Sequence, residues 1–174
     1  MGDGISDGLD DLTTQDVHTM QAAGEGMNYL ATICGNVATD KGFRDDWHIA
    51  DRLEHIALFL ERSDVGHTVF RTTSDDQQVT VADELRRAAE QMRINVIGMK
   101  LMLTVSELGE ALESLRNTGW QGMKEGLGNF DEEIADAHIR LLDLGHMLRV
   151  RIGSVLTAKV KKNRGRPRMH GRKV

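Results

Sequence analysis

Apolar residues recur every three or four positions along most of this chain, and this spacing is the period of an α-helix. The longest run extends from Val81 to about Arg116, where leucine, methionine and valine keep the helical period. A single proline and 4% aromatic residues leave too few turn and strand formers for a sandwich or a barrel. The sequence therefore predicts an all-α protein, a bundle of about five helices.

The helical pattern is divided by short polar stretches. The long polar stretch from Ser63 to Thr80 predicts a loop, either a lid or a short hairpin around Val69 and Phe70. Between such stretches we expect five helices, over 14–41, 45–62, 81–116, 129–150 and 154–164.

Glycines and an asparagine predict where the longest helices are interrupted. We expect a break in the long helix at Gly98 or Gly109, and a loop over the glycine-rich residues 117–128. Asn129 is a favourable N-cap for the next helix, and Glu132 has the spacing of its capping-box partner.

The length of 174 residues predicts one ordinary domain, which we place over residues 13–164. Residues 1–12 are rich in glycine and aspartate and predict a flexible leader, while 165–174 form a basic tail. No apolar run approaches the roughly 18 residues that would span a bilayer, so no membrane association is expected. With one cysteine and no secretory signal, we expect the protein in the cytoplasm.

Two carboxylate pairs share a spacing that places each pair on one helix face. Glu107 and Glu110 lie three residues apart in the long helix, and Glu133 and Asp136 repeat the spacing in the next one. Solvated glutamates are the ordinary explanation for any single pair, but these acids border strongly apolar stripes. An antiparallel return would bring all four together as a metal site between two helices, and all-oxygen ligands favour Mg²⁺ or Mn²⁺.

A di-iron bundle is the alternative use of inward-facing carboxylates. Its signature pairs a glutamate with a histidine three residues later, and this chain contains no Glu-x-x-His. Asp143 and His146 do have the spacing, on the same helix as Asp136. The sequence therefore weakens the di-iron alternative and leaves it open.

The two acidic pairs, in this order and spacing, resemble the signature of the all-α nucleoside triphosphate pyrophosphohydrolases, the MazG-like family. The C-terminal Lys159-x-x-x-Asn163-x-x-Arg166 is similar to the elements that close such domains. Gly42-Phe43 with Trp47 is similar to an aromatic segment that precedes their first metal helix. A serine stands at position 106, where the family often has another acid.

The resemblance implies that the chain hydrolyses nucleoside triphosphates, with deoxynucleotides as the expected substrates, to a monophosphate and pyrophosphate. It implies that Glu107, Glu110, Glu133 and Asp136 hold Mg²⁺, or Mn²⁺ in its place, and supply the catalytic carboxylates. It also implies a homodimer or homotetramer.

Phosphate or sugar binding is implied for residues of the last helix and its end. These residues are Lys159, Asn163 and Arg166, with Lys162 as a weaker candidate. The alternative for the lysines is that they complement the helix dipole. Trp47 is expected either to stack on a base or to anchor the core.

The basic tail supports a competing interpretation. Residues 149–174 hold ten lysines and arginines and no acid, whereas the other 148 residues carry 12 bases against 27 acids. Within the tail, Arg164 to Arg168 resembles an AT-hook, an extended segment that enters the minor groove of DNA. The alternative function is therefore a DNA-binding helical protein. The acidic remainder would repel DNA, so we rank this interpretation second.

Overall fold

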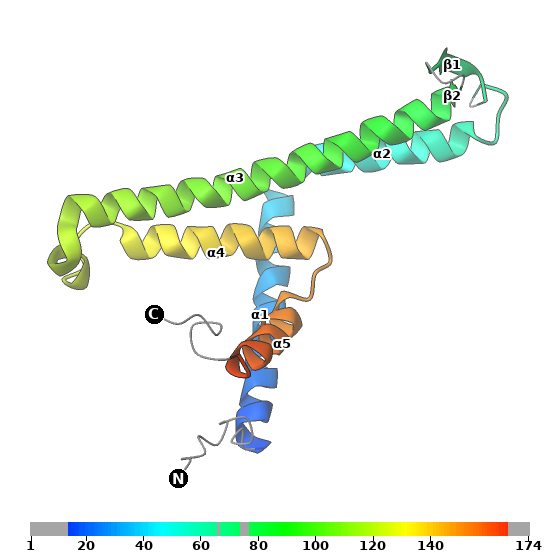
Figure 1. The fold of residues 1–174 in the computed structure, drawn as a ribbon. Coiled ribbons are helices and arrows are strands. Elements are labelled where there is room, and N and C mark those ends of the chain that lie inside the picture. The colour runs from blue at the N-terminus through cyan, green and yellow to red at the C-terminus, as the bar shows by residue number, and fades with distance from the viewer. Residues whose placement is uncertain (1–13, 66, 74–76, 167–174) are drawn as a thin grey trace, which may run out of the picture.

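The computed structural model describes residues 14–65, 67–73 and 77–166, which form five helices and a small hairpin (Figure 1). The elements, in chain order, are α1 (Thr14–Asp40), α2 (Asp45–Leu60), β1 (Val69–Thr72), β2 (Gln78–Thr80), α3 (Val81–Lys124), α4 (Phe130–Met147) and α5 (Ile152–Arg164). The predicted helical architecture is confirmed, and so is the hairpin near Val69.

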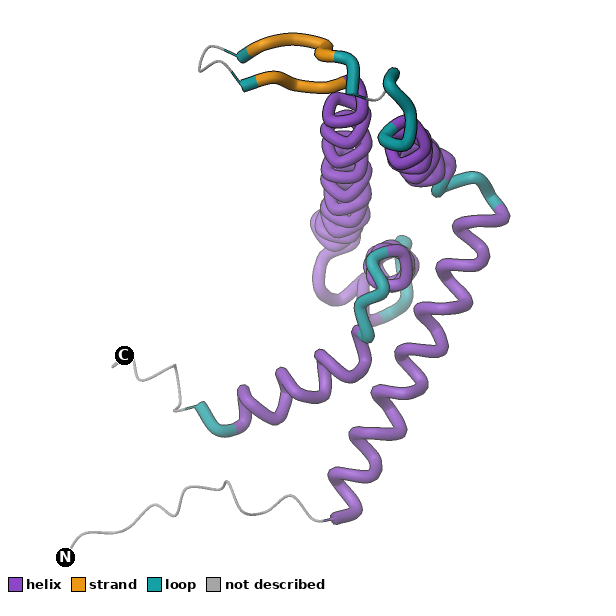
Figure 2. Tube along the Cα trace, turned by 90° about the vertical axis from the view of Figure 1, so that its right-hand side faces the viewer, coloured by secondary structure: helices purple, strands orange, loops and turns teal. Residues whose placement is uncertain are grey.

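Helix α3 is the long axis on which the other elements are arranged (Figure 1). Helix α2 packs along its N-terminal half and α4 along its C-terminal half, both antiparallel to it. Helix α1 crosses α4, and α5 packs on α1. In both views the start of α1 and the end of α5 lie on one side of the molecule, away from the hairpin (Figure 2).

Local interactions fix where α3 begins. The strands β1 and β2 are antiparallel and lead directly into the helix. The hydroxyl of Thr80 accepts a hydrogen bond from the backbone N–H of Asp83, and the Asp83 carboxylate accepts one from the Thr80 backbone N–H. This capping box satisfies two donors that would otherwise lack partners at the helix start.

The predicted break in α3 at Gly98 or Gly109 is wrong, because the helix continues through both glycines. Packing of α2 and α4 along its two halves offsets the roughly 1 kcal/mol that each helical glycine costs. The interruption occurs at Gly119, whose φ of 68° is in the region that favours glycine. Part of the predicted 117–128 loop is therefore helical, up to Lys124.

Two predictions about α4 also need correction. Asn129 occupies the N-cap position, but its side chain makes no cap hydrogen bond, so the predicted capping box with Glu132 does not form. The Asn129 amide donates to Glu133 instead. The helix ends at Met147 rather than near Val150, and Arg149 follows with a left-handed φ of 56°.

The helices bury few large apolar side chains between them. Its buried apolar residues are mostly alanines, and no large side chain of the described residues is fully buried. One cluster joins Val96, Leu144 and Met147. Many large apolar side chains of α3 remain exposed, among them Met102 at 64% and Val105 at 54%. None of the described helices combines the length and apolar character needed to cross a membrane.

Candidate metal centre

Three carboxylates of the predicted quartet come together between α3 and α4. One oxygen from each of Glu107, Glu110 and Glu133 lies within 4.8 Å of the other two. Glu107 and Glu133 are 6% and 8% exposed, while Glu110 is at the solvent edge. We call these three residues the carboxylate triad. Its formation follows from the antiparallel packing of α3 and α4.

Asp136 lies one turn beyond Glu133 on α4, exposed and outside the triad. It is nevertheless close enough for its charge to act on Glu133. Three members of the predicted quartet therefore meet directly, and the fourth lies at their border.

Without a cation, the charged forms of the triad carboxylates repel one another, and burial disfavours them further. Burial raises the pKa of the Glu133 carboxyl above its ordinary value of 4.5. The hydrogen bond with Glu107 raises this pKa further, as do the negative charges of Glu110, Glu107 and Asp136. A divalent ion would remove this repulsion, and the all-oxygen donor set fits Mg²⁺ or Mn²⁺.

Neighbouring side chains hold the triad in place. Arg140 Nε donates to Glu107 Oε1 at 2.6 Å, and the Asn129 amide donates to Glu133. The Ser114 hydroxyl accepts the Asn129 backbone N–H at 3.2 Å, which fixes the start of α4 against α3. Sequence reasoning missed Arg140 and the role of Asn129. Arg140 follows Glu133 by seven residues and Asp136 by four, so the helical period could have placed it on this face.

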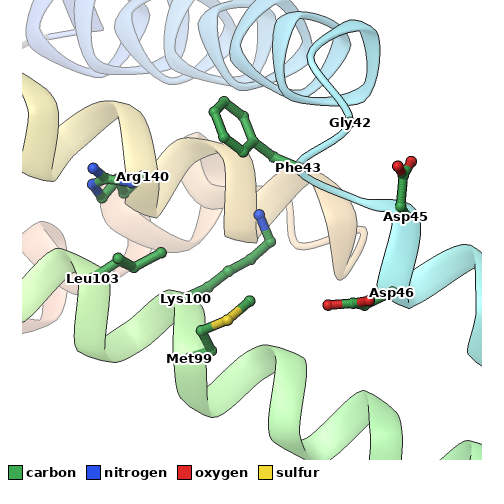
Figure 3. Close-up of a pocket in the computed structure, with 8 residues that line it drawn as sticks. All are labelled: Gly42, Phe43, Asp45, Asp46, Met99, Lys100, Leu103 and Arg140. Carbon is green, nitrogen blue, oxygen red and sulfur yellow. The ribbon is translucent and has the colours of Figure 1, made fainter.

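A cavity of about 470 Å³ lies between residues 42–46, α3 and α4 (Figure 3). Arg140 belongs to both this cavity and the triad, because it lines the cavity and binds Glu107. The close-up shows Phe43 and the Lys100 amine facing the same space, with Met99 and Leu103 on the α3 side. The lining residues are Gly42, Phe43, Asp45, Asp46, Met99, Lys100, Leu103 and Arg140. The cavity thus combines apolar surface with two cations, Lys100 and Arg140, and two acids, Asp45 and Asp46.

A second buried carboxylate, Asp143, is used quite differently. Its Oδ1 accepts Arg44 Nε and Nη2 at 3.2 and 2.5 Å, and its Oδ2 accepts Lys100 Nζ at 2.6 Å. All three residues are 7–9% exposed. Because both oxygens of Asp143 are bound to cations, the Asp143 and His146 pair of the di-iron alternative is not arranged as a ligand set.

The predicted phosphate-binding residues are not next to the triad. Lys159, Lys162 and Asn163 are exposed on α5, whose main packing partner is α1, and Arg166 follows this helix. Within one chain, the structure therefore does not bring these side chains to the carboxylates of α3 and α4 (Figure 1).

Trp47 occupies the position of a core anchor. It packs against the cluster of Val96, Leu144 and Met147, and the Arg93 guanidinium carbon lies 5.8 Å from its ring centroid. The stacking role expected for Trp47 stays a prediction.

The AT-hook-like segment is described only in part. Arg164 ends α5, and Gly165 and Arg166 follow as an exposed turn. Pro167 and Arg168 lie outside the described residues.

Comparison with protein-family models, with curated proteins and with solved structures gives no significant match to this chain. The MazG-like resemblance therefore depends on the motif residues alone.

Proposed function

We propose that this protein is a Mg²⁺-dependent nucleoside triphosphate pyrophosphohydrolase that cleaves between the α and β phosphates. The observation that carries the proposal is the convergence of Glu107, Glu110 and Glu133 from two antiparallel helices. Two of these carboxylates are buried, and burial, the hydrogen bond with Glu107 and nearby negative charges raise the pKa of Glu133. Carboxylates are held together in this way chiefly where a cation binds them.

The triad would hold the ion, with Asp136 at its exposed border. A bound divalent ion neutralises phosphate charge and lowers the pKa of a bound water. Arg140 orients Glu107, and Asn129 orients Glu133, so the carboxylates need little rearrangement when the ion binds. One carboxylate of the group would accept the proton of the attacking water.

The cavity between residues 42–46, α3 and α4 supports a nucleotide as the substrate. Its volume of about 470 Å³ is in the usual range for small-molecule sites. Phe43 and Leu103 supply apolar surface for a base or sugar. Lys100 and Arg140 also line the cavity, but they already pair with Asp143 and Glu107, so the proposal assigns phosphate charge mainly to the ion held by the triad. We propose deoxynucleoside triphosphates as the preferred substrates, following the motif resemblance.

The proposal includes a homodimer or homotetramer. The exposed apolar side chains of α3, such as Met102 and Val105, supply a surface that a second copy would cover. If Lys159 and Asn163 bind phosphate at the triad, they do so from another copy, because α5 packs on α1 in its own chain.

Product analysis tests the reaction. The purified chain would be incubated with each NTP, each dNTP and dUTP, with Mg²⁺ or with chelator, and the products separated by ion-exchange chromatography. We expect monophosphate and pyrophosphate only when metal is present. A diphosphate with orthophosphate, or product formation in chelator, would contradict the proposal.

Two glutamate variants test whether the triad carboxylates themselves, and not the negative charge of α3 in general, are needed for turnover. Glu110→Gln should reduce turnover more than the 10–100-fold typical of a residue that only supports a ligand. Glu113→Gln is the matched control, because Glu113 is exposed one turn further along α3. Equal turnover in the two variants would remove Glu110 from the site.

Mixing variants tests whether copies share a site. Glu110→Gln and Lys159→Ala chains, each inactive alone, should regain about one quarter of wild-type turnover when mixed and reassembled as dimers. Recovery is expected only if the two residues act at one site from different copies.

A further inference from the structure

A second cavity, of about 580 Å³, lies between α1, α2 and the C-terminal end of α4. Glu133 is in the first turn of α4, whereas His146 and Met147, which line this cavity, are in its last turn. At 1.5 Å per residue the two ends of the helix are about 20 Å apart. The second cavity is therefore separate from the carboxylate triad.

The lining of this cavity carries excess positive charge. Arg44, Arg149 and Arg151 contribute three guanidinium groups, and Asp51 is the single acid of the lining. Asp51 already accepts a hydrogen bond from Arg93 at 2.8 Å. Positive charge in a concave site attracts anions.

The packing around α1 leaves part of Arg44 available. Its Nε and Nη2 donate to Asp143, while its Nη1 has no acceptor in the part of the chain that the structure describes. A Cβ at Gly35 would lie 2.6 Å from Arg44 Nη2 and 2.2 Å from a ring carbon of His146. The absence of a side chain at Gly35 is thus what lets both residues take these positions.

The other two arginines have no assigned partner. Arg149 and Arg151 are exposed, and neither forms an ion pair or side-chain hydrogen bond within the described ranges 14–65, 67–73 and 77–166. Arg149 also has the left-handed φ of 56°, where glycine would be unstrained. This conformation belongs to the end of α4, where the Val150 N–H donates to the Gly145 carbonyl at 2.8 Å, and it turns the chain so that Arg149, Val150 and Arg151 line the cavity.

We propose that this cavity binds a phosphorylated small molecule, with the phosphoryl oxygens held by Arg44, Arg149 and Arg151. Guanidinium groups bind phosphate through paired N–H donors, which suits this lining. The volume exceeds the needs of a bare phosphate, and Trp47 and Val150 supply surface for an organic portion. An organic phosphate should therefore bind more tightly than an inorganic one.

Calorimetric titration of the full chain in chelator tests this proposal. The probes are adenosine 5′-monophosphate, inorganic pyrophosphate and orthophosphate. Chelator removes the divalent ion that the proposed pyrophosphohydrolase needs, so the two proposals fail independently. We expect the nucleotide to bind at least about tenfold more tightly than orthophosphate. No heat from any probe at millimolar concentration would overturn the proposal.

Paired variants assign the site. Arg149→Ala combined with Arg151→Ala should weaken nucleotide binding at least about tenfold, which corresponds to about one charged hydrogen bond. Arg62→Ala combined with Arg116→Ala removes the same charge from exposed positions elsewhere and should change affinity less than about twofold. Equal weakening by both pairs would mean that only net charge matters, and would overturn the assignment.

Arg149→Gly provides a readout that a purely structural role would not give. Glycine accepts the left-handed conformation, so the unfolding temperature should rise while nucleotide affinity falls at least about threefold. Unchanged affinity in this variant would remove Arg149 from the site.

Discussion

Helices α3 and α4 bury carboxylates in two regions, at Asp143 and at the triad, and the two regions differ in how many cations are bound to the carboxylates. Asp143 has Arg44 and Lys100 on its two oxygens, so two positive groups surround one negative group. The triad has three carboxylates close together, and Arg140 is the cation bound to it, at Glu107. Burial is similar in the two regions, because Asp143, Glu107 and Glu133 are all 6–8% exposed.

The comparison shows that burial of a carboxylate does not by itself indicate a ligand site. Asp143 is a structural ion pair that ties the start of α2 and the middle of α3 to α4. The triad has more negative charge than its protein partners balance, which is the condition for binding a cation. Each prediction below tests this difference.

The largest expected effect is a loss of stability when Asp143 is removed. Asp143→Ala leaves Arg44 and Lys100 buried without their anion, and we expect a loss of about 3–5 kcal/mol in the free energy of unfolding. Urea denaturation of the variant and of Glu113→Ala, an exposed control, measures this loss. A difference below about 1 kcal/mol would show that the two cations find water or other acceptors.

The second effect concerns metal binding at the carboxylate triad. Free Mg²⁺ at 100 times its dissociation constant should raise the free energy of unfolding by about 2.7 kcal/mol, because the ion binds the folded chain. Glu133→Gln should lose most of this gain and should not be less stable than the wild type in chelator, since it removes like-charge repulsion. Denaturation with and without Mg²⁺ measures both. An equal metal effect in the variant would contradict the assignment.

The third effect is a pH dependence of the metal-free protein. The folded state raises the pKa of Glu133, so the folded chain binds more protons than the unfolded chain between the ordinary value of 4.5 and the raised value. The contribution of Glu133 to stability should therefore fall as pH rises through this window. The wild-type unfolding temperature minus that of Glu133→Gln, measured in chelator from about pH 4.5 upward, should show this fall. A difference that rises with pH would reverse the sign of the argument.

The smallest effect should be equal in the two regions. A Cβ at Gly98 or at Gly109 would meet nothing within 4 Å, and both residues are helical. Gly98→Ala and Gly109→Ala should each stabilise the chain by about 0.5–1 kcal/mol, because alanine favours the helix. Thermal denaturation measures both variants. Unequal values would mean that backbone geometry, and not charge alone, differs along α3.

Local sequence patterns predicted the helices and all three members of the triad, together with Asp136, which lies outside it. The three-residue spacing in Glu107 and Glu110, and the loop that allows α4 to return antiparallel, were sufficient to bring Glu133 to them. The same patterns could not choose between glycines, because packing of α2 and α4 keeps Gly98 and Gly109 helical while Gly119 takes a positive φ.

Contacts between residues that are far apart in the sequence could not be predicted from local sequence patterns. Arg44 and Asp143 are 99 positions apart, and nothing near either residue indicates the other. The capping motif at Asn129 was outcompeted, since the asparagine side chain binds the nearby Glu133 carboxylate instead. Sequence alone also left Trp47 between two roles; its side chain packs against the cluster of Val96, Leu144 and Met147 and also lines the second cavity.

The branched arrangement of the helices affects how the molecule opens. Helix α5 is joined mainly to α1, and the two cross where Gly24 and Gly153 meet, because a Cβ at Gly153 would lie 1.8 Å from the Gly24 oxygen. Helix α4 instead packs against both α1 and α3. Amide hydrogens of α5 should therefore exchange with solvent first, through local opening of this helix. Amides in the centre of α3 and α4 should stay protected until the whole chain unfolds. Detachment of α5 would not break the packing of α3 on α4 that forms the triad, so we expect the basic α5 and the acidic centre to unfold as separate cooperative units.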